Sequence, residues 1–336
     1  MIKKYKIFFL NLLIFNSILL CSQNSDSISH KTLHYELTNF DTKIDLIIVS
    51  PDTCKQKKIL LFCQNEDPTP LFFDFGDDKI FMYAGGIINF DYKKLTEKFH
   101  LLIISKPNIP LIYNSTKIIN TEQGIKYAVD KFKKDGEFLK NDNLENNVTR
   151  ANLVLDFLST KKWVDTSKIV IIGYSRGAEI AAEIAINRKN VSKLILLNPF
   201  SEESATSQIL KIRQDAEKNK LTMEDAYKQI DEIYELYKTT NNQDIITKIP
   251  VVSYYGSYSF LFLENLINFN NPIYLGYGTD DVAAKICDII PIYFIKNKKE
   301  NLYLKRFVGL DHNFQPLNND KNEWNDVIKD VLNWIE

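Results

Sequence analysis

The chain has 336 residues, of which 45% are hydrophobic and 25% are charged. These values are typical of a globular protein, and the length suffices for one large α/β domain with an insertion. The formal net charge of −1 gives no reason to expect a nucleic acid or an anionic membrane surface as partner.

The N-terminus has the pattern of a targeting segment. Residues 1–6 are basic and residues 7–20 are largely apolar. A run of this length suits a signal peptide better than a bilayer span, which needs about 20 residues. We therefore expect residues 1–22 to be a signal peptide and the protein to be exported, periplasmic or secreted. Cys21 also permits a lipid anchor, although Leu20 is larger than the residue that usually precedes a lipidated cysteine, and an uncleaved anchor is a further alternative.

Apolar patterns predict the elements of the first half of the chain. Residues 34–37 and 43–49 alternate like two antiparallel strands. Continuous apolar runs at residues 58–63 and 101–104 predict buried central strands. Residues 144–161 have the apolar spacing of an amphipathic helix.

The most informative stretch is Gly-Tyr-Ser-Arg-Gly at residues 173–177. It follows the apolar run 169–172, which predicts a buried strand, and precedes an alanine-rich helix. In this context G-x-S-x-G is typical of a nucleophile elbow, whose strained turn projects the serine Oγ clear of the sheet. Gly173 and Gly177 are expected to avoid Cβ clashes between strand and helix. We predict that Ser175 is the nucleophile; a plain turn whose serine caps the helix is the alternative.

The second half alternates strands with helices around a polar insertion. Strands are predicted at residues 193–197, 272–276 and 301–307, and a terminal helix at residues 323–335. The segment 201–268 is too long for an ordinary loop and predicts a helical cap after the sixth strand. Its aromatic-rich part, from residue 251 on, either lines an acyl pocket or packs the insertion. Together the elements predict an α/β fold over residues 30–336, with a mostly parallel sheet and helices on both faces.

The cysteine pattern gives no framework of disulfides or ligands. Beyond Cys21 the chain has Cys54, Cys63 and Cys287, an odd number. One bridge, between Cys54 and Cys63, and buried free thiols are both open interpretations. Because no C-x-x-C occurs, nothing indicates zinc, and we expect neither a metal nor a cofactor.

A serine hydroxyl needs a base that removes its proton, and the chain has four histidines. His30 and His34 lie near the first strands, and His100 begins a strand, at the edge opposite the carboxyl ends where active sites form. His312 directly follows the last predicted strand. We therefore predict that His312 is the base.

The base needs a carboxylate that fixes its tautomer. Gly-Thr-Asp-Asp follows the strand before the last one and offers two adjacent aspartates. We expect Asp281 to reach His312, with Asp280 as the first alternative. Glu202 and Asp311 are further alternatives, and either adjacent aspartate can cap the following helix instead.

The order Ser175, Asp281, His312 is that of the α/β-hydrolase fold. Over about residues 40–336 the chain resembles α/β hydrolases, and its motifs look like those of the dienelactone hydrolase and prolyl-oligopeptidase-like esterase branch. The motifs that carry this resemblance are Trp-Val-Asp-Thr-Ser-Lys-Ile-Val-Ile-Ile-Gly-Tyr-Ser-Arg-Gly, Gly-Thr-Asp-Asp and Gly-Leu-Asp-His-Asn-Phe. The resemblance implies a serine hydrolase acting on a small-molecule acyl substrate.

Acyl transfer also needs two backbone N–H donors directed at the developing oxyanion. Arg176, next to the nucleophile, is expected to supply one. In the other donor loop many relatives have His-Gly, but this chain has Cys-Gln-Asn-Glu, so that Asn65 or Glu66 would donate. A Glu66 carboxylate beside an oxyanion is unfavourable unless it points away.

Side chains near the nucleophile are candidates for substrate contacts. We expect Tyr174 and Gln64 to contact the substrate. The Arg176 side chain can bind a substrate carboxylate, or it can pair with Glu179 one helical turn on.

Three functions fit these features. The first is an exported, carboxylesterase-like serine hydrolase that works through an acyl-enzyme. The unusual donor loop suggests a catalytically silent scaffold that binds a ligand or partner instead. An acyltransferase or thioesterase would use the same triad, and fold alone does not choose among these functions, the leaving groups or the oligomeric states.

Overall fold

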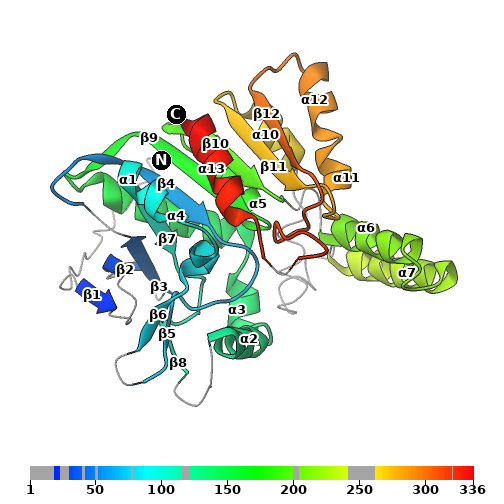
Figure 1. Cartoon of the computed structure of the whole chain (residues 1–336), viewed down its shortest axis with the longest axis horizontal. Helices are drawn as coiled ribbons and strands as arrows, with labels where there is room; N and C mark the ends of the chain where they lie inside the picture. The colour runs from blue at the N-terminus through cyan, green and yellow to red at the C-terminus, as the bar shows by residue number, and fades with distance from the viewer. Residues whose placement is uncertain are drawn as a thin grey trace, which may run out of the picture.

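The computed structural model describes residues 19–22, 30–39, 42–49, 52–76, 79–115, 121–199, 204–240, 262–319 and 321–336. Within these residues the chain forms a nine-stranded sheet (Figure 1). In the order in which they pair, its strands are β1 (Leu19–Ser22), β2 (His30–Asn39), β3 (Thr42–Val49), β7 (Phe99–Ile104), β4 (Lys57–Cys63), β9 (Val164–Tyr174), β10 (Val191–Leu197), β11 (Ile273–Gly278) and β12 (Leu302–Phe307). The pairs from β1 to β7 are antiparallel, and those from β7 to β12 are parallel. The predicted mostly parallel sheet is confirmed.

Helices cover both faces of this sheet. One core cluster joins alternate strand residues to α4 (Leu144–Ser159), α5 (Gly177–Asn187), α10 (Phe262–Asn268), α11 (Ala284–Cys287) and α12 (Ile290–Lys296). The other joins the remaining strand residues to η1 (Ala84–Asn89), α1 (Lys93–Lys98) and α13 (Trp324–Ile335). In β9, for example, Ile171 faces the first cluster and Ile172 the second. This alternation is why the central strands read as unbroken apolar runs.

A second, three-stranded sheet lies outside the elements predicted from sequence. It consists of β5 (Phe72–Asp74), β6 (Ile80–Met82) and β8 (Ile112–Asn114), in the order β6-β5-β8. With α2 (Thr121–Phe132) and α3 (Gly136–Asn141) it encloses a small aromatic core that includes Phe73, Phe132 and Phe138.

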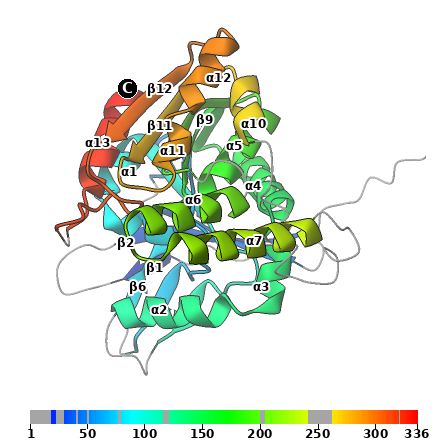
Figure 2. The ribbon, with the colours of Figure 1, turned by 90° about the vertical axis from the view of Figure 1, so that its right-hand side faces the viewer.

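Helices α6 (Ser204–Glu217) and α7 (Met223–Thr240) lie in the chain between β10 and β11, within the expected insertion. Figure 2 shows them side by side in front of the sheet edge. By contrast α10, which also falls in the expected insertion, packs on α5: Asn265 Nδ2 donates to Glu183 Oε2 at 2.6 Å, and Leu266 lies in the main core. The stretch 241–261, with most of the aromatic residues considered above, and residues 1–18 of the expected leader lie outside the described residues. Among the described helices, none has both the length and the apolarity needed to cross a membrane.

Two glycines allow loops from different strands to meet. A Cβ on Gly177 would lie 2.2 Å from the carbonyl oxygen of Cys63, at the end of β4. A Cβ on Gly278 would lie 2.2 Å from the carbonyl oxygen of Leu310. The absence of a Cβ on Gly177 therefore makes room for the end of β4, not for the end of β9. Of the two glycines in the motif, Gly173 is the one that allows β9 and α5 to meet, because its virtual Cβ would lie 2.4 Å from Gly177 O.

Gly177→Ala should lower the free energy of unfolding by about 2 kcal/mol or more, because backbone atoms have to move to admit the new methyl group. Urea unfolding measures this change. Gly136→Ala is the matched control, because no atom lies within 4 Å of its virtual Cβ. An equal loss in both variants would contradict the close packing at Gly177.

Candidate active site

Ser175 occupies the sharp turn between β9 and α5. Its backbone has φ +55°, in the left-handed region that costs free energy for a residue with a Cβ. The turn is held by its N–H, which donates to Leu197 O at 2.9 Å, and by its carbonyl, which accepts from the N–H of Ala178 at 3.0 Å. The side chain is fully buried at the carboxyl end of the parallel strands. A strained elbow therefore fixes the direction of Oγ.

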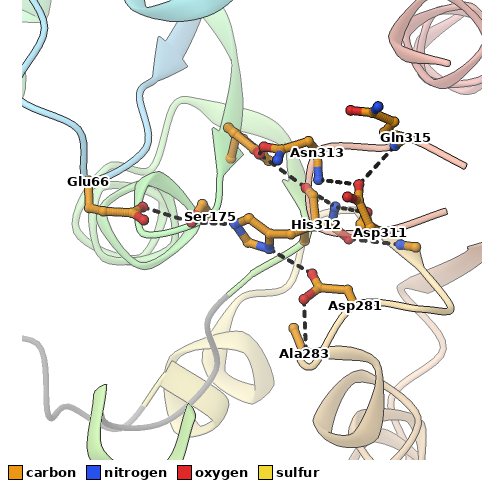
Figure 3. Close-up of polar contacts among 11 residues, drawn as sticks. Glu66, Ser175, Asp281, Ala283, Asp311, His312, Asn313 and Gln315 are labelled. Atoms are coloured by element: carbon orange, nitrogen blue, oxygen red, sulfur yellow. Dashed lines mark hydrogen bonds and ion pairs between the residues drawn. The ribbon is translucent and has the colours of Figure 1, made fainter. Parts of the chain in front are cut away.

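The structure brings Ser175, His312 and Asp281 together (Figure 3). His312 Nε2 lies 3.0 Å from Ser175 Oγ, and His312 Nδ1 lies 2.8 Å from Asp281 Oδ2. The other oxygen of Asp281 accepts from the N–H of Ala283 at 3.2 Å, and its side chain is only 1% exposed. The histidine is thus held between a hydroxyl and a buried carboxylate.

The alternative acids lie elsewhere. Asp280 lines the neighbouring cavity, and its N–H donates to Leu310 O at 2.9 Å. Asp311 Oδ1 accepts from the N–H groups of Asn313 and Gln315, at 2.8 and 2.9 Å, and so shapes the turn that carries the histidine (Figure 3). Glu202 lies outside the described residues. Of the three candidates that the structure describes, Asp281 is the one whose carboxylate hydrogen-bonds His312.

The other histidines considered from sequence are remote from this edge. His34 Nε2 contacts Asp45 Oδ1 at 2.8 Å in the antiparallel part of the sheet. His100 is buried in β7 and lies 3.0 Å from Trp163 O.

Asn198 ties the histidine loop to the end of β11. Its Nδ2 donates to His312 O at 2.6 Å and to Asp311 O at 3.4 Å, while its Oδ1 accepts from the N–H of Gly278 at 2.8 Å. The residue is fully buried and has φ +42°. Sequence reasoning treated it only as the end of a strand; the sole signal was an asparagine, which tolerates left-handed backbone, at the carboxyl end of β10.

Charges around His312 raise its pKa. Burial by itself lowers the pKa of His312, but the hydrogen bond to Asp281 and the charges of Asp281, Glu66 and Asp311 raise it above its ordinary value. The charged form of the imidazole is therefore favoured at this place.

Glu66 points at the nucleophile rather than away from it. Ser175 Oγ donates to Glu66 Oε2 at 2.9 Å (Figure 3). Burial by itself raises the pKa of Glu66, but its own backbone N–H, the charges of Arg176 and His312 and the Ser175 hydroxyl together lower it. Glu66 is therefore an ionised carboxylate in direct contact with Ser175. Sequence reasoning considered its backbone as a donor and missed this side-chain contact.

The side chains expected to contact substrate lie elsewhere. Gln64 is buried behind β4, where its Nε2 donates to Ile104 O at 2.5 Å, and it lines a separate small cavity. The Tyr174 hydroxyl donates toward His312 O at 3.1 Å and Asn313 Oδ1 at 3.0 Å. Neither borders the cavity described next. Tyr174 supports the histidine loop, and Gln64 contacts the end of β7. Asn65 Nδ2 donates to Asp67 Oδ2 at 3.1 Å.

A cavity of about 950 Å³ opens beside His312 under α6. Ionisable side chains of both kinds border it: the acids Glu66, Glu179, Asp280, Asp281 and Asp311, and the bases Lys133, Arg176, Lys211, Lys218 and Lys220. Burial raises the pKa of Glu179 to about 8, while the charge of Arg176 lowers it and that of Glu66 raises it. Apolar side chains, among them Phe138, Ile212 and Leu317, border the cavity as well, and α6 forms one of its walls.

Cysteines and metal ligands do not add to this site in the described part of the chain. Cys54, Cys63 and Cys287 are free thiols, so the Cys54–Cys63 bridge is not formed. Burial raises the pKa of Cys63 to about 12, and it remains a neutral thiol. No group of three or more His, Cys, Asp or Glu side chains among the described residues has the arrangement of a metal site.

No protein-family model matches the chain, and no curated protein matches it. Solved structures do resemble it. The α/β hydrolase GrgF from a Penicillium species matches with a TM-score of 0.54 and 14% identity, over 90% of this chain and 97% of its own. Acetyl xylan esterase 1 from a Thermoanaerobacterium species matches with a TM-score of 0.51 and 13% identity, over 94% of this chain and 87% of its own.

The acylaminoacyl peptidase of Pyrococcus horikoshii matches with a TM-score of 0.51 and 12% identity. The match covers 91% of this chain but only 41% of the peptidase, so the chain spans less than half the length of that protein. At such identities the likeness shows the fold alone. The chain has the α/β-hydrolase fold, as the sequence predicted.

Asn198→Ala should lower the free energy of unfolding by about 3 kcal/mol, because buried groups of the Gly278 and His312 loops lose their partners. Urea unfolding measures the loss. Asn198→Gly also removes these bonds but tolerates the left-handed backbone, so it should lose about 1 kcal/mol less. A glycine variant as stable as the wild type would show that the three bonds contribute nothing.

Proposed function

We propose that this chain, with its α/β-hydrolase fold, is a serine hydrolase that cleaves an ester of a small-molecule substrate through an acyl-enzyme. The observation that carries the proposal is the hydrogen-bonded chain from Ser175 Oγ through His312 to Asp281, with contacts of 3.0 and 2.8 Å. A hydroxyl, a base and an orienting carboxylate at hydrogen-bond distance are the parts that nucleophilic acyl transfer needs.

In this mechanism neutral His312 accepts the proton of Ser175 as Oγ attacks the carbonyl carbon. Asp281 stabilises the imidazolium at Nδ1. The backbone N–H groups of Arg176 and of Glu66 or Asn65 are the proposed donors to the oxyanion. His312 returns the proton to the departing alcohol, and water then hydrolyses the acyl-enzyme by the same route.

An ester is the preferred substrate class. The likeness to acetyl xylan esterase 1, which covers 94% of this chain, supports the proposal of ester cleavage. Thioesterase and acyltransferase activities would use the same side chains. We further propose that the protein is exported after removal of residues 1–22, with a lipid anchor at Cys21 as the alternative.

A second candidate function is a catalytically silent scaffold that binds a ligand. One observation favours it: the Glu66 carboxylate accepts the hydrogen bond of the proposed nucleophile. Reaction with a fluorophosphonate, which requires an activated serine, separates the two candidates.

Ser175→Ala should abolish labelling by a fluorophosphonate and lower the turnover of p-nitrophenyl esters by about 10⁴-fold or more, because the nucleophile is lost. Gel fluorescence and release of p-nitrophenol measure these effects. Ser167→Ala, at an exposed serine of the same strand, is the control. Labelling that persists in the Ser175 variant would contradict the proposed nucleophile.

Ester hydrolysis should be lost on acidification. His312 accepts a proton only when neutral, and its pKa lies above the ordinary value of about 6.5. The rate of turnover should therefore fall as the pH drops through a midpoint above about 6.5, and it should reach its maximum above this midpoint. The initial rate of hydrolysis between pH 4 and 10 measures the midpoint. A flat rate from about pH 4 to about pH 9 would contradict the role of His312.

A further inference from the structure

The Glu66 carboxylate lies beside the nucleophile and borders the cavity next to His312. It accepts from the nucleophile Ser175 Oγ at 2.9 Å, and its own backbone N–H is directed toward it. This N–H is one of the two groups proposed above as oxyanion donors. The carboxylate therefore occupies two groups that the proposed reaction needs free, the attacking oxygen and a candidate oxyanion donor.

With Glu66 ionised, the hydrogen-bond contacts of this arrangement allow one protonation state. An ionised carboxylate has no hydrogen, so the Ser175 hydroxyl donates its single hydrogen to Glu66. The 3.0 Å contact from His312 Nε2 to Oγ can then be a hydrogen bond only if Nε2 donates. Because Nδ1 donates to the Asp281 carboxylate at 2.8 Å, His312 carries two hydrogens and is an imidazolium. An imidazolium cannot accept the serine proton.

The surrounding charges agree with this state. Arg176 lies beside Glu66 and favours its ionised form, while Asp281 and Asp311 favour the imidazolium. Further titratable groups border the same cavity: Asp280 after β11, Glu179 on α5, and Lys133 after α2, which contacts Asp67 at 2.8 Å. Tyr174 on β9 lies outside this cavity but within reach of the charge of Glu66. With Glu66 at one end and Asp281 at the other, the cation of His312 lies between two carboxylates.

We propose that the Glu66 side chain is an internal inhibitor that holds the serine centre in a resting state. It takes the hydrogen of Ser175, fills the oxyanion position and keeps His312 protonated. This inference rests on the proposed hydrolase function and deepens it.

Release from the resting state requires that His312 loses one proton and that the Glu66 side chain moves. His312 loses its Nε2 proton to water, and the Ser175 hydroxyl hydrogen turns from Glu66 to the freed nitrogen. The carboxylate has to leave the oxyanion position as the carbonyl oxygen enters, and the cations Arg176 and Lys133 border the same cavity. The negative charge of Glu66 opposes both the loss of the proton and the movement of the side chain. Removing this charge should therefore activate the enzyme at low pH.

Three full-length proteins test the proposal: wild type, Glu66→Gln and Glu66→Ala. The glutamine keeps the shape without the charge, and the alanine empties the position while the backbone N–H remains. We expect the midpoint of the pH–rate profile for p-nitrophenyl acetate to fall by about one pH unit in Glu66→Gln. Well below this midpoint, both variants should react with a fluorophosphonate about tenfold faster than the wild type.

A second readout does not depend on turnover. The chain has four histidines, so ¹⁵N-histidine NMR spectra of the full chain are simple, and His312→Gln identifies the signal. The imidazole of His312 should titrate about one pH unit lower in Glu66→Gln than in the wild type. Asp156→Asn removes a carboxylate that pairs with Arg188 and does not border the cavity, and it should keep the wild-type midpoint.

The outcomes separate this inference from the proposed function. Unchanged midpoints and labelling rates in both Glu66 variants, in a wild type that hydrolyses esters at pH 9, would overturn the inhibitor and leave the hydrolase standing. A lower His312 midpoint without any labelling or turnover would support the effect of Glu66 on His312 and overturn the proposed hydrolase function. Slower labelling of both variants at every pH would overturn the inhibitor, because Glu66 would then assist the reaction.

Discussion

The hydrogen bond between His312 Nε2 and Ser175 Oγ depends on the carboxyl ends of four parallel strands, β9, β10, β11 and β12. The serine is fixed by its own elbow, but the histidine reaches it only because the ends of β10 and β11 accept the histidine loop at close range. Gly278 admits the backbone of Leu310 where a Cβ would clash at 2.2 Å. Asn198 then joins both loops through buried hydrogen bonds. Close packing of the loops at the carboxyl edge of the sheet therefore determines the geometry of the site.

Two carboxylates act on this centre from opposite sides, the buried Asp281 and the partly exposed Glu66. Asp281 contacts Nδ1 of His312 and would stabilise the imidazolium that forms during acyl transfer. Glu66 stabilises the same cation but also takes the hydrogen of Ser175. The electrostatic field that makes His312 a strong base thus also keeps it protonated. Such a centre would work best above the pKa of His312, or when a substrate displaces Glu66.

The sequence predicted what periodicity and local motifs encode. The parallel strands appear as apolar runs because both of their faces are buried, and G-x-S-x-G marks the elbow because only a strand–turn–helix suits it. The three-residue strand β5 was missed, because so short an element has no measurable period. The directions of Glu66 and Gln64 were missed because partners distant in sequence, Ser175 and Ile104, determine them. Position along the chain identified the histidine, and tertiary contact decided between the adjacent aspartates.

The most direct measurement is mass spectrometry of the chain quenched in acid during the hydrolysis of an activated ester. The account predicts a single acyl group on the peptide that contains Ser175, formed in a burst that releases one equivalent of alcohol per chain. Turnover with no acyl group on this peptide, or with the acyl group on another side chain, would contradict the account.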